Sequence, residues 1–179
     1  MCVVIDANTL SCVFKASNAN HSDFVPILNW VVRGRAKISL GGKLLRKEFE
    51  EKLCAYKNFL QELSRIKKVH VFDDSEIDNL TSEIEKQIED TDFDDPHIIA
   101  LLIISKATIL CSNDQRLFKY IHLVKRMTKG SSDPKIYTSI SHKPQIGLLC
   151  EENICPCGEH RQLPQHVAEK FMNLIEKKR

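Results

Sequence analysis

The chain has 179 residues, of which 42% are hydrophobic and 28% are charged, a composition typical of one ordinary globular domain. This composition excludes a disordered tail, and no apolar run approaches the roughly 18 residues that a membrane-spanning helix needs. Seven scattered cysteines, together with an apolar first segment that lacks a basic leader, predict a cytoplasmic protein without a disulfide framework.

The net charge of +2 conceals an uneven distribution along the chain. Residues 73–95 carry eleven acidic side chains and one lysine, whereas residues 31–70 carry eleven basic and four acidic ones. Residues 115–144 carry seven basic side chains and one acidic one. The basic flanks can attract a polyanion such as nucleic acid despite the small net charge, although solvated helix faces would give the same pattern.

Short apolar segments rich in β-branched residues alternate with longer amphipathic segments. In chain order, the pattern predicts strands at residues 2–5, 37–40, 69–72, 108–111 and 135–138. It predicts helices at 8–16, 24–32, 43–66, 75–89 with Ser75 as its cap, 95–105, 115–124 and 165–175. The alternation indicates βαβ units, and therefore an α/β fold with a parallel sheet flanked by helices.

Acidic residues follow the predicted strands or begin the next helices at comparable positions. They are Asp6, Glu48 (with Glu50 and Glu51 nearby), Asp95 and Asp114. Because ligand sites in parallel sheets lie at the carboxyl ends of the strands, we expect these acids to converge in one cleft. Carboxylates packed closely repel one another unless cations neutralise them, and oxygen ligands suit Mg²⁺ or Mn²⁺. Such a site can support metal-dependent hydrolysis of a phosphodiester.

Each acid also has a purely structural interpretation. Asp6 can cap the helix that follows it, and Glu48 can belong to a solvated helix face. Asp95 precedes Pro96, which fits a helix cap followed by proline at the first helical position, and Asp114 can be a turn residue. The four residues together are more specific than any one of them, because all fall at similar topological positions.

Four segments of the chain resemble, in order and spacing, the PIN-domain ribonucleases, a family that includes the toxins of VapBC-type toxin–antitoxin systems. The segments are VVIDANTL (3–10), GGKLLRKE (41–48), DDPHIIAL (94–101) and ATILCSND (107–114). The resemblance covers residues 2–149 and implies a PIN-like nuclease domain over 1–149, built as a three-layer α/β/α sandwich. Residues 150–179 would then form a C-terminal extension that ends in a helix.

The resemblance implies a Mg²⁺- or Mn²⁺-dependent endoribonuclease. The residues that would bind the metal and catalyse the reaction are Asp6, Glu48, Asp95 and Asp114, with Asn8 and Ser112 as supporting polar groups. The resemblance implies Asp95 rather than Asp94, because the acid of the family precedes its helix by this spacing. The resemblance also implies RNA as the substrate, a role as the toxin of a toxin–antitoxin or defence system, an antitoxin protein as partner, and a homodimer. The alternative is a non-catalytic PIN-like module that binds nucleic acid or protein.

Basic residues of the two flanks are predicted to guide the RNA strand toward the acids. They are Arg33, Arg35, Lys37, Arg116, Lys119, Lys125, Arg126 and Lys129. His97 lies two residues after Asp95, and a histidine at the head of a buried helix is more often a hydrogen-bonded structural group than a general base.

The C-terminal extension is rich in residues that can bind a metal. Cys150, Cys155, Cys157 and His160 could bind zinc, but the Cys-Pro-Cys spacing is tighter than that of common zinc sites. A turn with free cysteines that faces a partner is the favoured interpretation of this segment.

Overall fold

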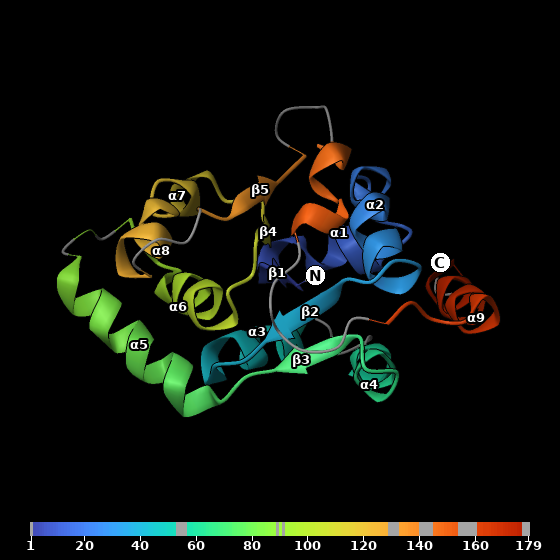
Figure 1. Ribbon diagram of the computed structural model, residues 1–179, viewed down its shortest axis with the longest axis horizontal. Helices are drawn as coiled ribbons and strands as arrows, with labels where there is room; N and C mark the ends of the chain where they lie inside the picture. Colours follow the sequence, from blue (N-terminus) through green and yellow to red (C-terminus); the bar gives the residue numbers. More distant parts are fainter. Residues whose placement is uncertain are drawn as a thin grey trace.

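The computed structural model describes residues 2–52, 57–88, 90, 92–128, 133–139, 145–153 and 161–176. Within them lies a five-stranded, all-parallel sheet with the strand order β3-β2-β1-β4-β5. The strands are β1 (Cys2–Ile5), β2 (Lys37–Leu40), β3 (Val69–Val71), β4 (Ile109–Cys111) and β5 (Lys135–Tyr137). Helices flank this sheet, which confirms the predicted α/β fold (Figure 1).

The helices connect the strands in the predicted alternation. They are η1 (Ala7–Thr9), α1 (Leu10–Phe14), α2 (His21–Val32), α3 (Lys43–Lys52), α4 (Lys57–Arg65), α5 (Asp74–Gln87), α6 (Pro96–Ser105), α7 (Gln115–Phe118), α8 (His122–Met127), η3 (Ile146–Leu148), η4 (Glu151–Asn153) and α9 (Gln165–Glu176). Here η denotes a 3₁₀-helix.

Several predicted helices differ in detail from the observed ones. The predicted helix over residues 8–16 is divided between the 3₁₀-helix η1 and α1, and the helix predicted over 24–32 begins at His21. Residues 43–66 hold α3 and α4 rather than one described helix, with residues 53–56 outside the described part of the chain. Residues 115–124 are divided between α7 and α8, because Tyr120 N–H donates to the Leu117 carbonyl three residues back and tightens the backbone. The cap of α5 is Asp73 instead of Ser75, since the Asp73 carboxylate accepts the Glu76 N–H at 3.0 Å.

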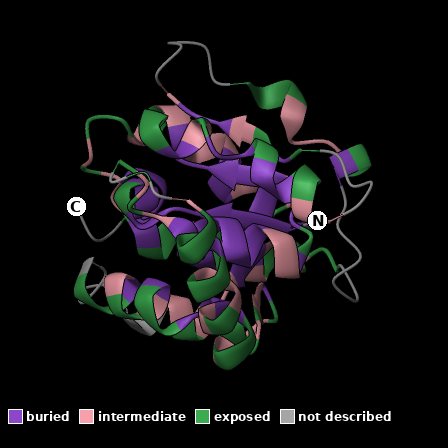
Figure 2. Cartoon of the chain, turned by 90° about the vertical axis from the view of Figure 1, so that its left-hand side faces the viewer, coloured by how far each residue is buried: buried purple, intermediate pink, exposed green. Residues whose placement is uncertain are grey.

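The centre of the sheet forms the core of the molecule. All residues of β1 and β4 are fully buried, as expected for strands covered on both faces (Figure 2). Helix α6 is buried over Ile98–Leu102, which explains why its sequence is apolar on nearly every side.

The parallel topology gives the sheet two chemically different edges. The strands end at the carboxyl edge, where residues 6, 41–42 and 112–114 follow β1, β2 and β4. Helix α6 begins at this edge, because it must run back to the start of β4. The opposite, amino edge holds residues 33–37 before and at the start of β2. Helix α9 lies beside α2 and α4, away from α5 and α6 (Figure 1).

Two expectations drawn from the composition concern membranes and cysteines. None of the helices in the described ranges is both long and apolar enough to cross a membrane. Cys12, Cys111 and Cys150 carry free thiols, whereas Cys2 is disulfide-bonded. The cysteines are therefore not all reduced in the structure, which departs from the predicted pattern.

Candidate metal centre

Asp6 is fixed at the carboxyl edge by hydrogen bonds to its backbone and to both carboxylate oxygens. Its N–H donates to the Cys111 carbonyl at 2.9 Å, which joins the ends of β1 and β4. The Ser112 hydroxyl donates to Asp6 Oδ2 at 2.5 Å, and the Asn8 N–H donates to Oδ1 at 3.1 Å. Asp6 therefore caps η1 and also stands in a polar network. The predicted support from Asn8 comes from its backbone, since residue 8 is exposed.

Asp114 is tied to the same network and to a neighbouring arginine. The Ser112 hydroxyl accepts the Asp114 N–H at 2.9 Å, so Ser112 links the two aspartates. Arg116 contacts the Asp114 carboxylate at 2.8 Å and Asp94 Oδ2 at 2.7 Å. The hydrogen bond from the Arg116 side chain is the main cause of a lowered pKa for Asp114.

Asp95 stands at the cap position of α6, but its side chain forms no capping hydrogen bond. Asp95 is therefore the cap residue of α6 with Pro96 at the first helical position, as predicted, but its carboxylate is not used for capping. Burial is the largest cause that raises the pKa of Asp95, to about 7, followed by repulsion from Asp6, Asp94, Glu48 and Asp114. The predicted acids thus act on one another electrostatically around Asp95.

Glu48 is positioned by a contact between α3 and α5. The first N–H groups of this segment donate to α5 carboxylates: Gly42 to Asp74 at 2.9 Å and Lys43 to Asp78 at 3.0 Å. Gly42 has φ of +81°, and a Cβ atom there would lie 2.8 Å from Ile77 Cγ2. Asp74 and Asp78 were missed as functional residues, because the sequence shows them only as part of an acidic stretch.

The carboxylates form two overlapping groups. One atom each from Glu48, Asp95 and His97 lie within 4.8 Å of one another, and so do atoms from Asp94, Asp95 and Asp114. Asp95 belongs to both groups. The structure thus brings three of the four predicted acids together and adds Asp94, while Asp6 acts on Asp95 electrostatically.

The three glutamates of α3 are distinguished by burial. Glu50 and Glu51 are exposed, and Glu51 lies 3.9 Å from Lys47 in a surface ion pair. The Glu48 side chain is 26% exposed and contributes to the cluster. Among these three glutamates, Glu48 is therefore the one that belongs to the carboxylate cluster.

His97 does not have the hydrogen bonds that its structural interpretation predicts. It is 3% exposed, and neither ring nitrogen has a hydrogen-bond partner. Its Nε2 lies 3.7 Å from Glu48 Oε2, which is within ion-pair range but too long for a hydrogen bond. Burial lowers the pKa of His97 to about 4, so the ring is neutral near pH 7 and the contact is not an ion pair there.

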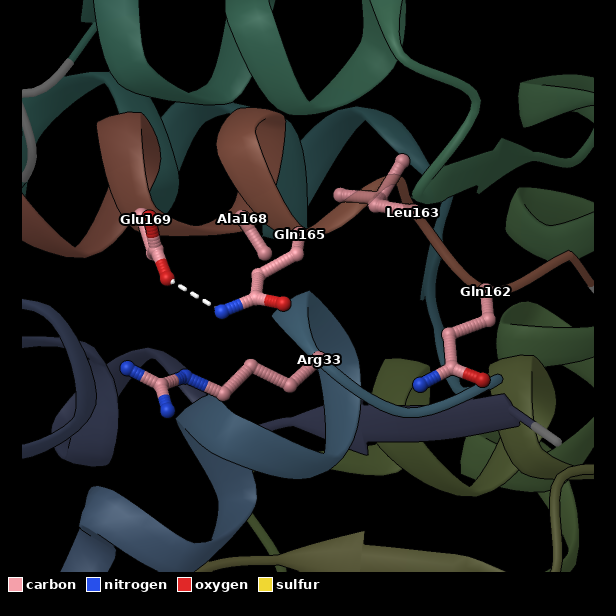
Figure 3. A pocket seen from close by; sticks show the side chains of 6 residues that line it. All are labelled: Arg33, Gln162, Leu163, Gln165, Ala168 and Glu169. Atoms are coloured by element: carbon pink, nitrogen blue, oxygen red, sulfur yellow. Dashed lines mark hydrogen bonds between the residues drawn. The ribbon is translucent and has the colours of Figure 1, made fainter.

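Three of the basic residues predicted to guide RNA lie away from the acids. Arg33, Arg35 and Lys37 stand at the amino edge of the sheet. Arg33 lines a cavity of about 280 Å³ beside α9, near the Gln165–Glu169 hydrogen bond (Figure 3). Arg35 lies 3.5 Å from Glu151. Parallel strands place residues 33–37 at the opposite edge of the sheet from the acids, and a role for these three residues in guiding RNA stays a prediction.

The second basic flank lies on α7, on α8 and between them. Lys119, Lys125 and Arg126 are exposed, whereas Arg116 is paired with the acids as described above. Lys129 is outside the described residues.

The possible zinc site falls almost wholly outside the described chain, which includes Cys150 but not Cys155, Cys157 or His160. Cys150 has a free thiol, and the Asn153 amide donates to its Sγ at 3.4 Å.

Comparison of the chain with protein-family models, curated proteins and solved structures finds no significant match. The function therefore has to be argued from the geometry of the carboxyl edge and from the sequence motifs.

Proposed function

We propose that the chain is a Mg²⁺- or Mn²⁺-dependent endoribonuclease whose metal centre is formed by Asp6, Glu48, Asp95 and Asp114. The observation that carries this proposal is the position of Asp95, which belongs to both carboxylate groups. Burial and the neighbouring carboxylates raise its pKa to about 7. Such a cluster is destabilising without a cation, and its oxygen-rich donors fit Mg²⁺ or Mn²⁺. The PIN-like motifs at residues 3–10, 41–48, 94–101 and 107–114 support RNA as the substrate.

The residues of the proposed site have different roles. Glu48, Asp95 and Asp114 offer carboxylate oxygens on residues that are not fully buried, whereas Asp6 is buried and accepts a hydrogen bond from Ser112. A divalent cation bound there would supply Lewis-acid activation of a phosphodiester. Arg116 is 52% exposed at its side chain and can bind a phosphate oxygen when it leaves the carboxylates.

The experiment is a cleavage assay on a labelled single-stranded RNA with Mn²⁺, with Mg²⁺ and with EDTA. We expect cleavage with either ion, no cleavage in EDTA, and a loss of at least 100-fold in Glu48→Gln and Asp95→Asn. Glu50→Gln is the matched control, because Glu50 is exposed on the same helix as Glu48 and lies outside both carboxylate groups. Full activity of Glu48→Gln and Asp95→Asn, purified in parallel, would contradict the site. A DNA strand of the same sequence tests the choice of RNA.

A further inference from the structure

His97 is a buried polar side chain whose hydrogen-bonding capacity is not used by the described residues. Both ring nitrogens are inaccessible to solvent, and neither has a hydrogen-bond partner among the described residues. Buried polar groups in native proteins are almost always satisfied, so an unsatisfied pair on one ring calls for an explanation.

One ring nitrogen of His97 lies close to two of the carboxylates. Its Nε2 is 3.7 Å from Glu48 Oε2, and one carboxylate oxygen of Asp95 lies within 4.8 Å of both residues' ligand atoms. Ligand atoms around one cation lie about 3 to 4 Å apart. One cation about 2.2 Å from each atom could therefore bind the His97, Glu48 and Asp95 atoms together. An imidazole nitrogen that accepts no hydrogen bond can offer its lone pair to a metal ion.

We propose that His97 Nε2 is a direct ligand of the divalent cation, together with Glu48 and Asp95, and that this imidazole makes the site prefer Mn²⁺ to Mg²⁺. Mg²⁺ strongly favours oxygen ligands, whereas imidazole nitrogen binds first-row transition metals well. Coordination would satisfy Nε2 and leave the proton on Nδ1. This inference rests on the metal centre proposed above, but it does not depend on RNA being the substrate.

The test measures the Mn²⁺ coordination sphere in the absence of RNA. We expect pulsed electron paramagnetic resonance of the Mn²⁺-loaded chain to show ¹⁴N coupling, which changes to ¹⁵N coupling when the histidines are ¹⁵N-labelled. This labelling experiment uses the unaltered chain, so it remains decisive if a His97 variant fails to fold. His97→Gln should lose the coupling and bind Mn²⁺ at least tenfold more weakly, with less than a threefold change for Mg²⁺.

Glu50→Gln is the control and should keep both the nitrogen coupling and the Mn²⁺ affinity of the unaltered chain. Absence of nitrogen coupling in the loaded unaltered chain would overturn the proposal and leave His97 as a neighbour of Glu48 only. Failure to bind Mn²⁺ at millimolar concentration would overturn it as well. Nitrogen coupling in a chain that cleaves no RNA would retain the His97 ligand while removing the proposed substrate. Cleavage of RNA by a chain that shows no nitrogen coupling would retain the proposed substrate and remove the His97 ligand.

Discussion

Asp6, Asp95 and Asp114 occupy similar positions in the sequence, but the protein compensates their charges differently. Asp6 accepts hydrogen bonds from Ser112 and Asn8, and Asp114 accepts them from Arg116. Asp95 has no capping hydrogen bond. The sequence predicts where each acid stands relative to its strand or helix. It does not predict this difference, because the compensating contacts depend on how two strand ends meet.

The raised pKa of Asp95 makes the stability of the metal-free chain depend on pH. Its pKa is about 7 in the folded chain and near 3.9 when unfolded, so the folded state binds more protons between these values. The free energy of unfolding should therefore fall as pH rises from about 4 to 7. Between about pH 4 and 7, we expect the free energy of unfolding of the unaltered chain to fall by on the order of 2 kcal/mol more than that of Asp95→Asn. This figure is reduced for the screening of Asp95 by solvent.

Urea denaturation in EDTA at several pH values would measure this difference. Glu50→Gln should keep the pH dependence of the unaltered chain, and adding Mn²⁺ at about pH 8 should recover the lost stability. Parallel pH profiles for Asp95→Asn and the unaltered chain would contradict the raised pKa.

Arg116 competes with a bound cation for the carboxylates of Asp94 and Asp114. Replacing it by glutamine removes a positive charge that lies within 3 Å of both residues. We expect Arg116→Gln to bind Mn²⁺ about fivefold more tightly, a modest effect because solvent screens this exposed ion pair. Isothermal titration calorimetry checks this, with Arg116→Lys as the charge-conserving control. Weaker or unchanged binding in Arg116→Gln would show that the arginine does not compete.

At the scale of secondary structure, the orientation of α3 depends on α5. Asp74 and Asp78 accept N–H groups more than thirty residues away in the chain, and Arg46 lies 2.9 Å from Asp74. Helical periodicity predicts that both helices exist, but a periodic pattern says nothing about which carboxylate meets which helix terminus. This is why the acidic stretch could be recognised from the sequence while its structural role could not.

The close approach of α3 and α5 depends on Gly42. Alanine there would need φ of +81° and would place its Cβ 2.8 Å from Ile77 Cγ2. We expect Gly42→Ala to lower the free energy of unfolding by about 1–3 kcal/mol. Gly147→Ala is the matched control, because no atom lies within 4 Å of the added Cβ and its φ is not positive. Equal denaturation midpoints for the two variants would contradict a steric requirement at Gly42.

At the scale of the whole molecule, the parallel sheet places the two basic flanks at opposite edges, although both have the same kind of charge in the sequence. Arg33 and Lys37 stand at the amino edge, whereas Arg116 stands at the carboxyl edge with the acids. Counting charges along the chain predicts two basic flanks, but only the strand direction decides which flank meets the acids. Short apolar segments that contain β-branched residues were enough to predict each strand, and the shared edge follows from the strands being parallel.

Lys68 connects the sheet to the segment before α9. It is 1% exposed, and its ammonium donates to the Gly34 carbonyl at 2.7 Å and to the Arg161 carbonyl at 2.9 Å. Lys68→Met keeps the apolar stem but leaves these carbonyls without that donor, so we expect a loss of about 1–3 kcal/mol in the free energy of unfolding.

Because residue 161 leads into α9, amide hydrogen exchange in α9 should accelerate more than in α6. Lys67→Met alters the adjacent, exposed lysine and should leave both quantities unchanged. Equal acceleration in α6 and α9 would instead indicate that Lys68 stabilises the fold as a whole and does not specifically anchor the C-terminal helix.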